Sequence, residues 1–155
     1  MSHRTNVEWM GTRVDTLADL LPSSARAVII GVNPAPISVE AGHYYQGQLG
    51  QRLWQRLERC GLLTPTAGHW EDDEAVAAGF GFTDIVKRPT SSAGGLHPGE
   101  REHGAAALLE KLETLRPSAV RVGESSGGGE GGDSRSGTLG HRPGSPGRTP
   151  ADVLL

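Results

Sequence analysis

A short apolar run that ends in glycine, asparagine and proline constrains the fold of this chain more than any other feature. Residues 25–31 include consecutive β-branched side chains and close on Gly31, a pattern typical of a buried strand. Pro34 then fixes the backbone of the following loop, so that Asn33 lies just beyond the strand. Because open α/β sheets bind ligands beyond the carboxyl ends of their strands, Asn33 is the first candidate for a functional side chain.

Further strands and helices alternate along the chain up to residue 122. Apolar spacing and stop signals predict helices over 14–21, 51–60 and 100–115, and strands over 79–86 and 119–122. Residues 31–50 are expected to form a loop rich in glycine and proline. The alternation predicts an α/β fold of three layers, α/β/α, with a short, mostly parallel central sheet that is incomplete at its C-terminal edge.

Composition divides the chain into three regions. Residues 1–24 form a polar segment with a short helix that ends at Pro22, and residues 25–122 form the α/β domain. Residues 123–155 form a tail rich in Gly, Ser, Pro and Arg, with too few large apolar side chains to offset the entropy of ordering, so we predict that it is disordered. The net charge of −3 gives no general attraction to polyanions, and a nucleic-acid site would need a local basic face.

The residue types that bind metals or form disulfides are sparse. Cys60 is the single cysteine, which excludes an intramolecular disulfide, fits a reducing compartment and predicts a small buried apolar side chain. Six scattered histidines give no zinc-ligand spacing, and the acidic run 71–74 is expected to be solvated, so we predict no metal and no cofactor. The chain has no apolar run near ~18 residues, and we expect a cytoplasmic monomer without membrane contact.

Four blocks in order resemble the mismatch-specific uracil/thymine DNA glycosylases, a branch of the uracil-DNA glycosylase superfamily. Residues 31–34, Gly-Val-Asn-Pro, resemble that family's G-[IV]-N-P motif, and residues 42–45, Gly-His-Tyr-Tyr, resemble its Gly-His-His-Tyr segment. Residues 52–54 and the block Gly-Phe-Thr-Asp-Ile-Val-Lys-Arg-Pro-Thr at 81–90 are also similar. The sequence departs from the family over 46–51, and nothing after residue 122 matches the family's late minor-groove loop.

The resemblance implies a monofunctional enzyme that flips uracil or thymine out of a G:U or G:T mismatch in double-stranded DNA and hydrolyses its N-glycosidic bond. It implies that Asn33 positions the attacking water, that the backbone of Val32 and Tyr45 binds the pyrimidine, and that the Tyr45 ring stacks on it. The residues expected to line the substrate pocket are Gly31, Val32, Pro34, His43 and Tyr45.

The residues themselves support part of this chemistry. A carboxamide cannot accept a proton usefully near neutral pH, so Asn33 can only orient water, and we expect a slow enzyme. Lys87, Arg88 and Thr90 follow a predicted strand and form a small basic and polar cluster that could contact DNA phosphates.

Alternative interpretations remain open at this point. Asn33 and Pro34 could form an ordinary turn, Tyr44 and Tyr45 could divide between core and surface, and the basic cluster could be a solvated loop. The whole chain could be a catalytically impaired remnant that binds nucleic acid weakly. It could also be an unrelated α/β domain that binds a nucleotide.

Overall fold

The structure is a computed structural model that describes residues 1–115, 117, 120–122 and 153–154. The strands are β1 (Arg4–Trp9), β2 (Thr12–Leu17), β3 (Ala27–Gly31), β4 (Phe80–Asp84), β5 (Val120–Val122) and β6 (Val153–Leu154). The helices are α1 (Pro36–Ala41), α2 (Gln48–Arg59), α3 (Glu71–Ala77), the 3₁₀ turn η1 (Ala93–Gly95) and α4 (Glu100–Leu115). No helix within these residues is long and apolar enough to cross a membrane.

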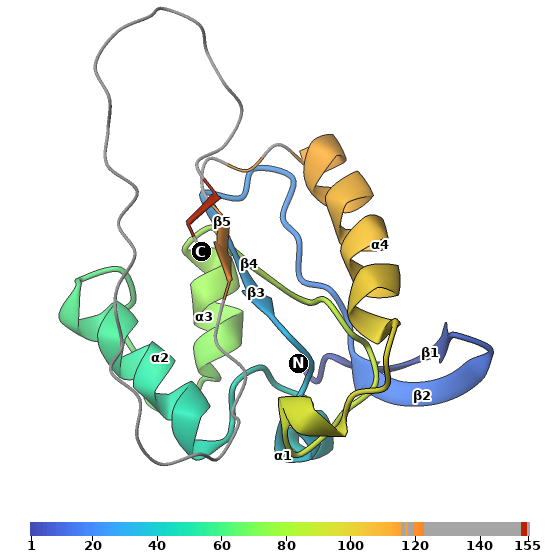
Figure 1. The fold of residues 1–155 in the computed structure, drawn as a ribbon. Helices are drawn as coiled ribbons and strands as arrows, with labels where there is room; N and C mark the ends of the chain where they lie inside the picture. The colour runs from blue at the N-terminus through green and yellow to red at the C-terminus, as the bar shows by residue number, and fades with distance from the viewer. Residues whose placement is uncertain (116, 118–119, 123–152, 155) are drawn as a thin grey trace, which may run out of the picture.

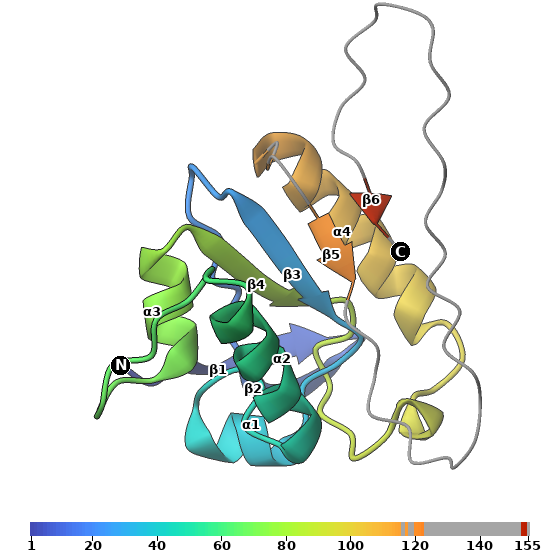
Figure 2. The same ribbon diagram turned by 90° about the vertical axis from the view of Figure 1, so that its left-hand side faces the viewer.

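A four-stranded parallel sheet lies between two helical layers, as the alternation predicts. The strand order is β4-β3-β5-β6, and each neighbouring pair is parallel. Figure 1 and Figure 2 show α2 and α3 on one face of the sheet and α4 on the other. Successive β3 side chains point to opposite faces of the sheet. Ile29 packs in the cluster that includes Trp54 and Phe82, whereas Val28 and Ile30 pack with Leu108.

The first 17 residues form a β-hairpin, so the predicted helix over 14–21 is wrong. β1 and β2 pair antiparallel, and Val7 lies directly opposite Val14. Met10 and Gly11 make the turn with φ values of 50° and 80°, the left-handed backbone at both central residues that a type I′ hairpin turn requires. The apolar spacing of the segment fits a helix, but pairing with β1 satisfies the backbone of β2 along its length, and this long-range contact decides the structure.

The segment after the hairpin closes one side of the sheet. Leu20 forms an isolated antiparallel bridge with Phe82, the central residue of β4. Both backbone bonds of the bridge are present, at 2.9 Å from Leu20 N to Phe82 O and 2.7 Å from Phe82 N to Leu20 O. The outer edge of β4 is therefore paired at its middle.

Several local predictions need correction. The predicted loop over 31–50 contains α1, where Pro36 occupies the first turn, and α2 begins at Gln48, three residues earlier than expected. Cys60 is exposed, so the prediction of a buried side chain is wrong: it caps the C-terminal end of α2, whose buried large side chains are Trp54 and Leu57. α4 spans the predicted residues 100–115. Of the predicted disordered tail, only Val153 and Leu154 lie within the described residues, and they add β6 to the sheet.

Candidate active site

The side-chain amide of Asn33 is held by the loop that follows β4. Its Nδ2 lies 2.7 Å from Thr90 Oγ1, 3.3 Å from Thr90 O and 3.2 Å from Pro34 O. The Thr90 hydroxyl donates to Ser92 O at 2.6 Å, so its oxygen accepts from Asn33. Within the described residues no donor bonds to Asn33 Oδ1. The amide is thus fixed through its NH₂ group, and its carbonyl oxygen remains able to accept a hydrogen bond from a water molecule.

Backbone bonds align the two loops that carry this contact. Gly31 pairs with Asp84 at the ends of β3 and β4, and beyond them Ile85 N donates to Gly31 O and Val86 N donates to Val32 O. Thr90 N donates to Pro34 O at 3.3 Å. The parallel register therefore brings together residues separated by 57 positions in the sequence.

Gly31 leaves the space into which two other site residues project. A Cβ atom at this position would lie 2.0 Å from Asp84 Oδ1 and 3.4 Å from Tyr45 Oη. Tyr45 reaches it from a left-handed backbone with a φ of 57°, and its ring contacts Trp54 and Phe82 edge-on. A larger residue would clash at position 31, which explains the glycine there. Tyr45 lies beside Gly31 at the end of β3.

The two tyrosines of the predicted pocket segment have different surroundings. Tyr44 is a core residue, 2% exposed, and its hydroxyl donates to Ala18 O at 3.0 Å. Tyr45 is half-buried, but its hydroxyl oxygen is enclosed and has no hydrogen-bond partner among the described residues. Only the part of Tyr45 outside this enclosed end can face a flipped base.

Burial perturbs two ionisable groups beside Gly31. Loss of water around the Asp84 carboxyl raises its pKa to about 7; nearby Lys87 opposes this rise and Asp19 adds to it. Burial also raises the pKa of the Tyr45 phenol well above its usual value, with a smaller contribution from the Asp84 charge. Asp84 can therefore exist as a neutral acid near neutral pH, and Tyr45 stays protonated.

His43 is oriented inward and not toward solvent. It is 3% exposed, its Nδ1 lies 2.8 Å from Asp72 Oδ1, and its ring stacks on Trp70 at 4.1 Å. Asp72 Oδ2 also accepts from Tyr44 N at 2.7 Å. The expectation that the acidic run 71–74 is solvated is therefore wrong for Asp72, which is fully buried. His43 and Asp72 fix the loop that carries Tyr45, and a contact between His43 and substrate stays a prediction.

The two basic residues predicted to contact DNA both have carboxylate partners. Lys87 Nζ lies 2.5 Å from Asp19 Oδ1. Arg88 forms two bonds with Glu100, at 3.0 Å and 2.6 Å, and a third with Gly95 O. A phosphate would have to compete with these ion pairs, so their role in DNA binding stays a prediction.

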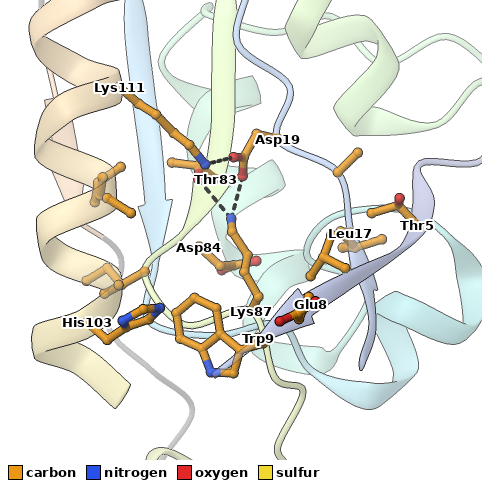
Figure 3. A pocket seen from close by; sticks show the side chains of 16 residues that line it. Thr5, Glu8, Trp9, Leu17, Asp19, Thr83, Asp84, Lys87, His103 and Lys111 are labelled. Carbon is orange, nitrogen blue, oxygen red and sulfur yellow. Dashed lines mark hydrogen bonds and ion pairs between the residues drawn. The ribbon is translucent and has the colours of Figure 1, made fainter. Parts of the chain in front are cut away.

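A cavity of about 310 Å³ lies between the hairpin, the end of β4 and α4. Figure 3 shows Lys87 and Lys111 both directed at Asp19 inside it, with His103 beside Trp9. Its lining includes neither Asn33 nor Tyr45. Lys87 and Lys111 share the single carboxylate of Asp19, so both lysines are already paired within the cavity.

Comparison with known proteins decides the family. The sequence profile of the uracil DNA glycosylase superfamily matches residues 18–123, which include β3, Asn33, Tyr45 and the block that ends at Thr90. The chain belongs to this superfamily. A "G/U mismatch-specific uracil DNA glycosylase" of Schizosaccharomyces pombe is 33% identical over 101 residues, which cover 64% of this chain. The chain spans about a third of that relative's length (31%).

Superfamily membership excludes the alternative of an unrelated nucleotide-binding domain and confirms the α/β fold class. The hairpin β1–β2 lies outside the matched region. Sequence reasoning missed the Asn33–Thr90 bond and the support that Asp72 gives to the Tyr45 loop. The position of Thr90 at the end of the block 81–90, which resembles the family's, was the available signal for the first of these.

Proposed function

We propose that this chain is a mismatch-directed DNA glycosylase that hydrolyses the N-glycosidic bond of uracil, and also of thymine, opposite guanine in double-stranded DNA. The observation that carries the proposal is the anchored Asn33 amide, whose NH₂ group is bound by Thr90 and Pro34 while its carbonyl oxygen has no donor within the described residues. Superfamily membership and the mismatch-specific glycosylase of Schizosaccharomyces pombe to which the chain is similar support the reaction class.

The proposed reaction begins with extrusion of the base, which costs a few kcal/mol and least for a mismatched pair. A water molecule that donates a hydrogen bond to Asn33 Oδ1 then attacks the sugar carbon, and the pyrimidine leaves as an anion. Asn33 holds this water but does not take its proton, because a carboxamide is not a base at neutral pH. The C–O bond forms as the C–N bond breaks, and the water's proton passes to bulk solvent. Backbone N–H groups in the loop after β3 are suited to stabilise the developing charge on the base.

The proposed base pocket uses Gly31, Val32, Pro34 and Tyr45, with Tyr45 as a stacking partner. A base stacked on an aromatic ring gains ~1–3 kcal/mol in single-stranded complexes, so Tyr45 could offset much of the flipping cost. Asp84, beside Gly31, can donate a hydrogen bond when protonated, which suits a carbonyl oxygen of the pyrimidine.

The test is single-turnover release of uracil from a labelled duplex with one G:U pair, using the full chain. We expect release by the natural sequence and a loss of about 100-fold or more for Asn33→Ala. Asn6→Ala is the matched control, since Asn6 is an exposed asparagine in the hairpin, and it should retain activity. Equal release by Asn33→Ala and the natural sequence would remove Asn33 from the mechanism.

The same experiment addresses the second candidate function, a remnant that binds DNA without cleaving it. Arg52, Arg56 and Arg59 are all exposed on α2, which begins just after Tyr45, and they give a local basic face. Duplex binding that weakens with salt, without release of base from either G:U or G:T, would favour this candidate.

A further inference from the structure

Four side chains with metal-binding atoms converge outside the proposed catalytic site. His3 precedes β1, His43 lies between α1 and α2, and Asp72 and Asp73 lie in the first turn of α3. One nitrogen or oxygen from each lies within 4.8 Å of the other three. We call this group the His-Asp cluster. It joins three segments that are distant in the sequence.

The members of the His-Asp cluster already contact one another in pairs. His3 Nε2 lies 2.7 Å from Asp73 Oδ1 and 3.9 Å from Asp72 Oδ2, and His43 Nδ1 lies 2.8 Å from Asp72 Oδ1. The other contacts come from the backbone and the chain terminus: Tyr44 N and Asp73 N donate to Asp72, and the Met1 ammonium lies 2.9 Å from Asp73 Oδ2.

These separations fit a small cation after modest movement. With ligand bonds of ~2.0–2.2 Å, a tetrahedral zinc site places its nitrogen and oxygen ligands ~3.4 Å apart. The observed distances of 2.7, 2.8 and 3.9 Å lie on both sides of that value. These three pairs would therefore move by about 0.5–0.7 Å, within the reach of side-chain rotation.

Burial and orientation single out this cluster from ordinary surface acids. Asp72 is fully buried and His43 is 3% exposed, and buried charges in proteins are paired or coordinate metals. Trp70 stacks on the His43 ring at an interplanar angle of 11°, which fixes the plane of the imidazole. His3 is 15% exposed and Asp73 33%, so one side of the cluster remains open for an ion to enter.

We propose that His3, His43, Asp72 and Asp73 form a binding site for a divalent cation of the zinc type. Two imidazoles favour Zn²⁺ over Mg²⁺ and Ca²⁺, which prefer all-oxygen ligands. Two carboxylates supply the charge that balances a dication. The bound ion would tie the start of the hairpin and α3 to the loop that carries Tyr45. The proposal rests on residues outside the Asn33 loop and does not depend on the proposed glycosylase activity.

The test uses tag-free full chain, freed of metal with EDTA and then titrated with Co²⁺ and Zn²⁺. Tetrahedral Co²⁺ gives visible absorption bands, so we expect bands that saturate at one ion per chain and disappear when Zn²⁺ is added. Calorimetry should give the same stoichiometry for Zn²⁺, and the melting temperature should rise with Zn²⁺ concentration.

His3→Gln and Asp73→Asn change the two more exposed members, so both variants should fold, which circular dichroism would verify. Each should weaken Zn²⁺ binding by more than about tenfold, the lower end of what even an outer partner of a ligand costs. His69→Gln is the matched control, because His69 lies beside α3 but contacts Glu74 at 3.7 Å instead of the cluster. Absent cobalt bands, or equal affinity in His3→Gln and the natural sequence, would show that the cluster is only a hydrogen-bonded network.

Discussion

The Asn33 amide donates to the Thr90 hydroxyl across 2.7 Å, and this bond joins the loop after β3 to the loop after β4. Thr90 in turn donates to Ser92 O, so its hydroxyl hydrogen is already committed and its oxygen must be the acceptor. The direction of the bond fixes which end of the Asn33 amide is available to the water of the proposed reaction.

Removing the Thr90 hydroxyl should lower the rate of base release without abolishing it. Thr90→Ala leaves Asn33 Nδ2 with its weaker carbonyl partners only, and a lost hydrogen bond of ~0.5–1.5 kcal/mol corresponds to a fall of about threefold to tenfold. Thr90→Ser keeps the oxygen and should stay near the natural rate. Single-turnover release from a G:U duplex measures both. A serine variant as slow as the alanine variant would contradict the role of the hydroxyl.

A methyl group at Gly31 should destabilise the fold. The added Cβ would lie 2.0 Å from Asp84 Oδ1 in a packed interior, so we expect Gly31→Ala to lower the free energy of unfolding by about 2 kcal/mol or more. Gly47→Ala is the control: its Cβ would meet only Ile37 at 3.6 Å, and the loss should be less than about 1 kcal/mol. Urea denaturation measures both values. In a Gly31→Ala/Asp84→Ala double variant the loss should be less than additive.

The buried Asp84 carboxyl should make stability fall as pH rises. Its pKa is about 7 in the folded chain against an ordinary 3.8, so between these values the folded state holds the proton that the unfolded state has released. The stabilisation is complete below about pH 4 and is lost as pH rises to about 7. Asp84→Asn stays neutral. We expect the urea midpoint of Asp84→Asn minus that of the natural chain to increase from pH 4 to pH 7 and then stay level. If the two midpoints instead change with pH in parallel, the Asp84 pKa lies near its ordinary value.

The exposed arginines of α2, and not Lys87 or Arg88, should carry the salt dependence of DNA binding. Arg52→Gln and Arg56→Gln should each reduce the slope of log affinity against log salt by about 0.9, the value for one lost phosphate contact. Lys87→Gln and Arg88→Gln should leave the slope unchanged, because these residues are engaged by Asp19 and Glu100. Fluorescence anisotropy with a G:U duplex measures the slopes. If Lys87→Gln reduces the slope by the same amount, Lys87 contacts a phosphate, as the sequence predicts.

Local sequence patterns were sufficient where an element is defined by its own residues. The apolar run of β3 and the flanking prolines and periodicity of α4 predicted both elements closely. The hairpin was missed because its turn uses Met10 and Gly11, a weaker signal than Asn-Gly, and because β2 depends on pairing with β1.

The site could be predicted only in part, for a related reason. Asn33 and Tyr45 carry recognisable motifs, but the Asn33–Thr90 bond depends on the register between β3 and β4, which no local pattern encodes. The burial of Asp72 likewise arises from contact with His43, 29 residues away. Charge in the sequence suggested solvent exposure there, and tertiary hydrogen bonding overrode it.

The bridge between Leu20 and Phe82 has a consequence for how copies of this chain meet one another. An unpaired strand at the border of a sheet is a template for recruiting a strand from a second molecule. Here the segment after the hairpin occupies both backbone positions at the centre of β4, so that border is already capped from within the same molecule. The two hydrogen bonds between Leu20 and Phe82 of the same chain therefore oppose edge-to-edge aggregation through β4.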